Sequence, residues 1–458
     1  MSAIQPNVHP GANGDPNRPA LYSSANRDIL RVMLKPTVLW AFAFSLALIS
    51  MVIGGYCWYY QVIWGMGYAG ITHPTFWGVY IVDFVFWVGI GHAGTLISAI
   101  LYLVRSRWRT GVYRAAEAMT VFAVMTAGLF PVLHLGRCWQ MYYFFPYPNQ
   151  RQLWMNFKSP LMWDVFAIST YLTVSSVFFV IGLIPDIAIA RDHATGLVKQ
   201  VYGLLALGWR GTGRQWRHFA AAYGFFAAFA APLVLSVHSV VSWDFATANT
   251  AGWHSTIFPP YFVAGAIYSG CGMVLTLLIP MTYLFKWHDY VNNWHFESLA
   301  KMCMLTSAIL TYAYSVEYFI AWYSQNPYEQ AIFYWRATGE YAWAFWLMVF
   351  CNCIAPLPFY FKKVRTSPVW LFAISILINI GMWMERFNIV VSSPAHDFDP
   401  ATWGMYSPTW VEWGITLGSF GWFSFWFLLF CKTLPAIAIT EIKEMIAPPM
   451  KGGGEKHA

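Results

Sequence analysis

Charged residues are scarce in this 458-residue sequence. Asp, Glu, Lys and Arg make up 10% of it, against about 25% in an average soluble protein. Hydrophobic residues make up 58%, with 26 Trp, 27 Tyr and 36 Phe. This composition excludes an ordinary soluble domain and indicates a chain that crosses a membrane many times. The net charge of +7 is therefore no argument for nucleic acid as a partner, and we expect none.

Cysteine clusters and a signal peptide are also missing. The closest cysteines are Cys351 and Cys353, a spacing that fits neither a zinc nor an iron–sulfur site. We therefore predict no metal site and no iron–sulfur cluster in this chain. A haem is not expected either, because membrane haems need two histidines at one depth and His92 has no partner predicted at its level. The polar residues 1–36 lack the apolar core and cleavage pattern of a signal peptide.

Long apolar runs dominate the remaining sequence. Ten of them are long enough to span a bilayer, for which about 20 residues are needed. We therefore predict an all-α integral membrane protein with ten transmembrane helices, in a membrane domain of residues 37–435. The predicted spans are 37–63, 76–104, 113–136, 161–186, 219–243, 257–285, 302–324, 340–361, 367–392 and 409–435.

The basic residues predict the orientation of these spans. Most Lys and Arg lie in the two tails and in the loops on their side, whereas the opposite loops hold only Arg137, Arg151, Lys158 and Arg336. Cytoplasmic loops carry the excess of Lys and Arg. Residues 1–36 and 436–458 are therefore predicted to be cytoplasmic tails.

A faint internal repeat suggests how the spans are grouped. The segment Val79–Leu96 resembles Pro260–Leu277, and the sequence VVS at Val240–Ser242 recurs at Val390–Ser392. We predict two related four-helix bundles, spans two to five (about 76–243) and spans six to nine (about 257–392), with spans one and ten peripheral. Apolar helices also resemble one another by chance. Repeats of this kind in transporters place binding sites near their interface.

Ionisable residues gather at one predicted depth, near the ends of the spans that face away from the tails. Each alone has an ordinary explanation, such as a snorkelling side chain or a histidine bonded to a backbone carbonyl. Ionisable residues that come from several helices and lie at one depth favour a functional site. The residues are His134, Asp164, His238, Asp244 and Arg386, and Asp83 lies about 10 Å down span two from the same side by helical rise.

Glu385 and Arg386 are neighbours inside span nine. Adjacent side chains on a helix point about 100° apart, so we expect each residue to find its own partner on another helix. The alternative for Arg386 is snorkelling to the nearby interface.

The residue types fit a quinone headgroup, a flat ring with two oxygens. Such a ring needs a donor or acceptor at each oxygen, and imidazole or a buried carboxylate can take up the protons of quinol oxidation. Deeper polar residues form a candidate proton path, although some of them could equally serve close helix packing. The path residues are Asp83, His92, Thr95, Ser98, Glu317 and Glu385.

Several motifs resemble the NrfD/PsrC-like family of quinone-interacting membrane subunits. They are the segment His134–Asp164, FAISTYLTVSS at Phe166–Ser176, IPDIAIARD at Ile184–Asp192, PLVLSVHSVVSWDFA at Pro232–Ala246, Gly252–Gly270, and MERFNIV around Arg386. The resemblance covers residues 35 to 435. Within the family, the ten spans look most like the ActC branch, found in bacterial alternative complex III.

The resemblance implies an inner-membrane subunit of an oxidoreductase that oxidises menaquinol near the periplasmic side. It implies catalytic roles for His134, Asp164, Asp244 and Arg386, quinol contacts from His238, and a proton route through Asp83 and His92. The implied partners are a periplasmic iron–sulfur protein, multihaem cytochrome c subunits, a homologous ten-span subunit and lipids. Three alternatives stay open: a subunit of a polysulfide reductase or hydrogenase complex, a proton-conducting subunit without quinone chemistry, and a passive anchor.

Overall fold

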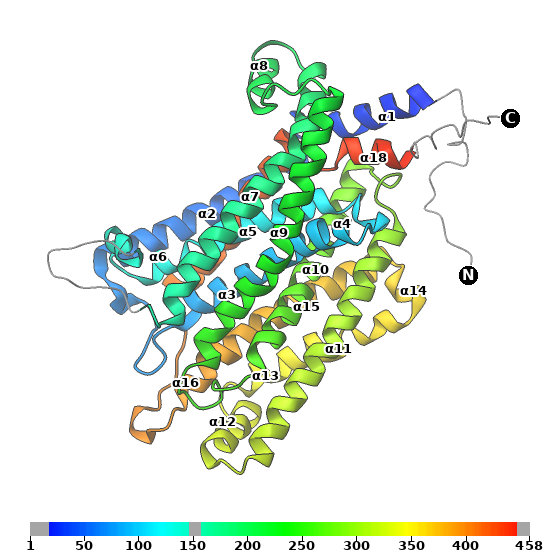
Figure 1. Ribbon diagram of the computed structural model, residues 1–458. Coiled ribbons are helices and arrows are strands. Elements are labelled where there is room, and N and C mark those ends of the chain that lie inside the picture. Colours follow the sequence, from blue (N-terminus) through cyan, green and yellow to red (C-terminus); the bar gives the residue numbers. More distant parts are fainter. Residues whose placement is uncertain (1–17, 146–156, 447–458) are drawn as a thin grey trace.

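Ten helices in the described part of the chain are long and apolar enough to cross a membrane, and they form the body of the protein (Figure 1). The computed structural model describes residues 18–145 and 157–446, and these contain helices and no strands. The all-α, ten-span prediction is confirmed. The spans are α2 (Val38–Trp64), α3 with α4 (Gly78–Leu103), α5 with α6 (Tyr113–His134), α7 (Pro160–His193), α9 (Gly213–Ala246), α10 (Phe258–Phe285), α11 (Asn293–Tyr323), α13 and its extension (Ala342–Tyr360), α15 with α16 (Pro368–Ala395) and α17 (Trp410–Thr433).

Both predicted tails contain a helix. These are α1 (Arg18–Leu30) and α18 (Ile439–Ile446), which pack against one another at one end of the bundle (Figure 1). We call this end the α1/α18 end. The opposite end carries α6 and α16 together with a short helix that crosses no membrane, α12 (Pro327–Thr338).

Spans two to five pack together, and so do spans six to nine. The two groups meet where α3 crosses α10, and α3 is the most buried of the ten spans. Small residues allow this approach, since a side chain at Gly270 would collide with Ala93. Gly94 plays the same part between α3 and α5, where a side chain would collide with the backbone of Ala116. Small residues are the common device for close helix packing in membranes. The predicted sequence relation between the two groups stays a prediction.

The first and last spans form a peripheral pair. Helix α2, the least buried span, packs along α17. Their backbones nearly touch, because a Cβ atom built on Gly54 would lie 2.5 Å from the Cα atom of Gly418. The side chain of Cys57 fills the space beside Gly414 in the same way.

This contact predicts a strong effect of size at position 54. A Gly54→Leu protein is expected to lose about 1–3 kcal/mol of stability, the usual cost of overpacking, because the two backbones must separate. Thermal unfolding of the purified protein in detergent measures the loss. The matched control is Gly55→Leu, since nothing lies within 4 Å of a Cβ atom at Gly55. Equal unfolding temperatures for the two variants would contradict the close contact.

Three spans extend beyond their predicted ends. Helices α7, α9 and α11 run past residues 186, 219 and 302 into polar sequence at the α1/α18 end. Polar caps begin two of them, with Thr212 and Gln215 at the start of α9 and Asn292 at the start of α11. Hydropathy locates the apolar part of a span, whereas the helix continues until its backbone groups are capped.

Candidate functional site

A pair of carboxylates lies at the end opposite α1 and α18. Asp164 is on the second turn of α7 and Asp244 on the last turn of α9, and the two side chains are direct neighbours. Asp164 is only 5% exposed. Apart from this neighbour, no hydrogen-bond donor among the described residues reaches either oxygen of Asp164, nor Oδ1 of Asp244. Two adjacent carboxyl groups cannot both ionise easily, so the pair is suited to hold one proton between them.

His134 ends α6 at the same end of the bundle. Its ring lies 6.0 Å from the ring of Tyr80. Tyr80 donates to Gln61, which in turn donates to the carbonyl of Leu133 at 2.9 Å. The Nδ1 atom of His134 is buried and has no partner among the described residues. Its neighbour Tyr80 is thus fixed in place, while the imidazole keeps one nitrogen for a ligand or water.

His238 lies deeper than predicted. It is eight residues before the end of α9, about 12 Å by helical rise, and its ring centroid lies 4.5 Å from that of His92 in mid-membrane. The expectation that His238 shares the level of His134 is therefore wrong. The reason is that α9 continues to Ala246, beyond the predicted end of the span.

The expectation that His92 has no partner at its depth is wrong as well, because His238 faces it. The two rings lie closer together than two imidazoles on opposite sides of a haem iron could. His92 donates through Nδ1 to the carbonyl of Val88, which leaves its Nε2 free as an acceptor. Neither nitrogen of His238 has a partner within residues 18–145 and 157–446.

Arg386 and Glu385 form a direct ion pair, contrary to the expectation of separate partners. Nη1 of Arg386 lies 2.7 Å from Oε1 of Glu385, and both side chains are fully buried. Both side chains are long enough to bend towards each other despite the angle between them. Glu385 also accepts a hydrogen bond from Tyr314, whose oxygen in turn accepts from Asn352 at 3.0 Å.

Arg386 connects this pair to the histidines. Its guanidinium lies 4.3 Å above the ring of Phe262, and His238 contacts the same ring at 5.6 Å. The span continues through a π-helical turn, Asn388–Ser392, to Ala395. Arg386 is therefore about 13 Å from the end of the span by helical rise, deeper than the common level predicted from the sequence. Snorkelling to the near interface does not describe a side chain buried in this way.

Asp83 points away from His92, because the nine-residue spacing between them places the two residues on opposite faces of α3. Its carboxylate accepts hydrogen bonds from Trp383 at 2.8 Å and from Thr416 at 2.6 Å. Both donors line an apolar crevice of about 490 Å³ between α3, α10, α15 and α17. Within the described residues, no hydrogen bond joins Asp83 to the histidine pair, so a proton path containing both needs further groups.

The predicted path residues Thr95 and Ser98 follow His92 along the span. The hydroxyls of Thr95 and Tyr171 are 2.7 Å apart, and Tyr171 stacks on the ring of His92 with centroids separated by 5.0 Å. Ser98 donates to the carbonyl of Thr95 at 3.4 Å. A π-helical turn, Leu96–Ile100, follows at this point of the span, and such turns are frequent at functional sites.

Glu317 on α11 is half-buried, and its nearest charges are Arg336 and Glu385. Arg336, which the sequence places in a loop, is instead buried on α12 and donates to the carbonyl of Gly252 at 3.3 Å. Glu317 thus belongs to the second bundle and lies near Glu385.

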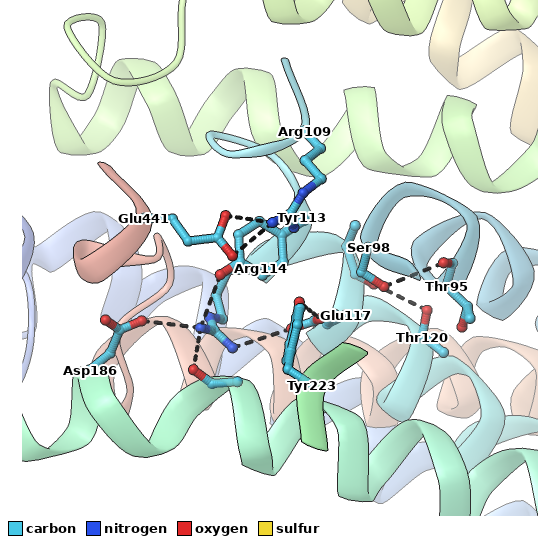
Figure 2. A network of polar contacts seen from close by, with 12 residues as sticks. Thr95, Ser98, Arg109, Tyr113, Arg114, Glu117, Thr120, Asp186, Tyr223 and Glu441 are labelled. Carbon is cyan, nitrogen blue, oxygen red and sulfur yellow. Dashed lines mark hydrogen bonds and ion pairs between the residues drawn. The ribbon is translucent and has the colours of Figure 1, made fainter. Parts of the chain in front are cut away.

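Sequence reasoning missed two groups of polar residues. Tyr171 and Tyr314 complete the surroundings of His92 and Glu385, and tyrosines among so many aromatics give no distinguishing signal. A buried charge network at the α1/α18 end also escaped notice (Figure 2). Its signal was present as Arg114, Glu117 and Asp186, three charges inside predicted spans.

The site residues thus fall into three neighbouring sets. The first is the carboxylate pair, the second is His134 with Tyr80, and the third is the histidine pair with Arg386 and Glu385. Among described residues, no hydrogen bond or ion pair links Asp164 or Asp244 to Arg386. What the sets share is buried polar atoms that have no partner within residues 18–145 and 157–446. Such atoms are costly unless a ligand or water satisfies them.

Comparison with known proteins gives a family match. Residues 68–395 match the family model described as "Polysulphide reductase, NrfD". This stretch contains all of spans two to nine and excludes α2 and α17. The match therefore separates the two inner bundles from the peripheral pair.

Individual relatives are distant. A Halobacterium salinarum protein, named as a membrane component of a dimethyl sulfoxide reductase, is 28% identical over 231 residues, 50% of this chain and 49% of the relative. A selenate reductase component of Mesobacillus selenatarsenatis is 20% identical over 395 residues, 81% and 88% of the two chains. The Hdr-like menaquinol oxidoreductase integral membrane subunit of Archaeoglobus fulgidus is 22% identical over 331 residues, 71% and 73%. The chain spans about half the length of the first of these relatives.

Proposed function

Since the chain belongs to the polysulphide reductase NrfD family, we propose that it is the quinol-binding membrane subunit of an oxidoreductase complex. The three relatives are each named as part of a reductase or oxidoreductase, and one is named for menaquinol. An enzyme subunit of this kind has no complete activity alone. It binds the quinol and hands its electrons to a partner.

The buried carboxylate pair is the observation that supports this proposal best. Asp164 and Asp244 lie at the end of the first bundle that faces away from α1 and α18. They have carboxylate oxygens that accept no hydrogen bond from a donor among the described residues. A quinol brings two hydroxyl donors and an apolar tail that prefers lipid, and therefore supplies what the site lacks. His134 offers its unpartnered Nδ1 as a second acceptor at the same end.

The chemistry at the site is proton transfer. Oxidation of one quinol releases two protons and two electrons. One proton passes from a quinol hydroxyl to the Asp164–Asp244 pair, and the other to His134, both held ready as acceptors. His238 and Arg386 lie deeper, and the positive charge of Arg386 stabilises a partly deprotonated ring. The electrons leave to an iron–sulfur protein at the same end and then to multihaem cytochrome c subunits.

A more specific assignment follows from the motif resemblance. We propose a role in alternative complex III, in the ActC branch, with menaquinol as substrate in a bacterial inner membrane. The α1/α18 end would be cytoplasmic and the carboxylate pair periplasmic, and the membrane partner would be a homologous ten-span subunit. In this proposal the two inner bundles are repeats, and proton translocation uses the path from Asp83 and His92 through Thr95 and Ser98, with Glu317 and Glu385 in the second bundle.

Binding of a quinol analogue tests the proposal. An Asp244→Asn complex is expected to bind a hydroxyquinoline-type inhibitor at least about tenfold more weakly, because one acceptor of a charge-assisted hydrogen bond is lost. Quenching of the inhibitor's fluorescence measures the dissociation constant. The control is Asp192→Asn, an exposed residue at the α1/α18 end. Unchanged binding in Asp244→Asn would favour the rival interpretations, a proton conductor without quinone chemistry or a passive anchor.

A further inference from the structure

A second cluster of ionisable groups is buried at the α1/α18 end, on the opposite side of the membrane domain from the carboxylate pair (Figure 2). Arg114 lies at its centre and is 1% exposed. Its guanidinium contacts the carboxylate of Glu117 at 3.2 Å, that of Asp186 at 3.1 Å and the carbonyl of Gly182 at 2.6 Å. Tyr223 donates to Glu117 at 3.0 Å. These contacts hold the arginine and the glutamate in fixed positions.

Helix α18 covers this cluster. The backbone N–H of Thr440 donates to Asp186 at 3.0 Å, and Glu441 accepts two hydrogen bonds from Arg109 at 2.8 and 2.9 Å. The preceding residues Ala436–Ile439 are almost completely buried. Helix α18 is thus held over the cluster by apolar packing, which includes its contact with α1, and by one ion pair and one backbone hydrogen bond. Glu441 itself is 20% exposed.

A line of hydroxyl groups leads from the cluster towards the histidines. Thr120, one turn along α5 from Glu117, donates to the carbonyl of Gly91 at 2.7 Å. Tyr171 contacts the same carbonyl at 2.9 Å. Tyr171 also contacts Thr95 and stacks on His92. Thr95, Ser98 and Thr120 thus lie between the histidines and Glu117 (Figure 2), although no hydrogen bond among the described residues joins Thr120 to Glu117.

We propose that Glu117 is the proton-exchanging carboxyl of this end, and that α18 controls its access to water. This inference rests on the proposed function, because Glu117 would supply the histidine pair with protons from the side away from the quinol. The step moves a proton only: Glu117 takes one from water when the Arg109–Glu441 pair opens, and passes it to the hydroxyl line while Arg114 balances the remaining charge.

The surroundings single out Glu117 among the carboxylates of the cluster. All three carboxylates accept hydrogen bonds: Asp186 from Arg114 and the backbone of α18, Glu441 from Arg109, and Glu117 from Arg114 and Tyr223. Glu117 alone of the three lies on the helix that also carries Thr120. The charged and titratable groups facing it are Arg109 in the preceding loop, Tyr113 and Arg114 on its own helix, Asp186 on α7, Tyr223 on α9 and Glu441 on α18.

Chemical labelling tests directly whether α18 covers Glu117. The reagent is dicyclohexylcarbodiimide, which modifies protonated carboxyl groups in membranes. In the intact complex, Glu441→Gln is expected to raise labelling of Glu117 at least about threefold, because the weakened ion pair lets α18 open. Peptide mass spectrometry measures the labelled fraction. Glu412 is the internal control, since it is buried under three hydrogen bonds far from α18. Unchanged labelling of Glu117, or an equal rise at Glu412, would overturn the proposal.

Proton uptake tests the role of the carboxyl. In vesicles holding the complex, Glu117→Gln is expected to reduce quinol-driven proton uptake from the α1/α18 side at least about tenfold, and Glu117→Asp to restore part of it. Asp192→Asn, an exposed residue at the same end, should match the wild type. Full uptake in Glu117→Gln would overturn the inference. If the wild-type complex neither bound nor oxidised quinol, the proposed function would fail instead, and the labelling result would still stand.

Discussion

An assembled complex carrying Asp164→Asn is expected to oxidise quinol at less than about one hundredth of the wild-type rate. General base catalysis contributes about 10²–10⁴ to a rate, and asparagine keeps the shape of aspartate but cannot take up a proton. Asp164 is the more enclosed member of the carboxylate pair and has no protein donor among described residues to compensate. The measurement is steady-state quinol:acceptor turnover of the purified complex.

Two controls make the result interpretable. Subunit and cofactor content must equal those of the wild type, since a disassembled complex is inactive for a trivial reason. Asp192→Asn should retain full turnover, because Asp192 is 61% exposed and pairs only with its neighbour Arg191. Normal turnover of an intact Asp164→Asn complex would remove Asp164 from the chemistry and leave the passive anchor or the proton conductor as the interpretation.

The largest effect on stability is expected at Arg114. Replacing one partner of a buried ion pair costs about 3–5 kcal/mol, because the other charge stays buried without compensation. Arg114→Gln would remove the buried cation that pairs with Glu117 and Asp186, and the hydrogen-bond donor to the carbonyl of Gly182. The protein is therefore expected to unfold at a clearly lower temperature in detergent, with reduced assembly of the complex.

Arg107→Gln is the matched control, because Arg107 is exposed in the loop that precedes the same span. It should leave the unfolding temperature unchanged. If Arg114→Gln were as stable as the wild type, the cluster would have to rearrange or admit water without cost, and the fixed network of Figure 2 would be incorrect.

The number of spans could be predicted because hydropathy and length are local properties of the sequence. The depth of individual residues in the membrane could not be predicted equally well. His238 and Arg386 were assigned to the level of His134 by counting residues from predicted span ends, and both lie deeper because α9 continues to Ala246 and span nine continues through a π-helical turn. Helix ends and such turns depend on caps and packing, which hydropathy does not record.

Contacts between side chains on different helices were also predicted only in part. The opposite directions of Asp83 and His92 followed from helical periodicity and are confirmed by Trp383, Thr416 and Tyr171. The sequence could not predict that His92 contacts His238, because this contact depends on how two helices cross. It could not predict the ion pair of Glu385 and Arg386 either, because that pair depends on how two long side chains bend. Asp164 and Asp244, both close to helix ends, were placed together correctly.

A structure of the assembled complex with a bound quinol analogue tests the quinol site most directly. We expect the ring oxygens within hydrogen-bonding distance of the Asp164–Asp244 pair and His134, with the tail directed to lipid. The same ring found only at the α1/α18 end, or in the crevice beside Trp383 and Thr416 with the carboxylate pair untouched, would contradict the assignment.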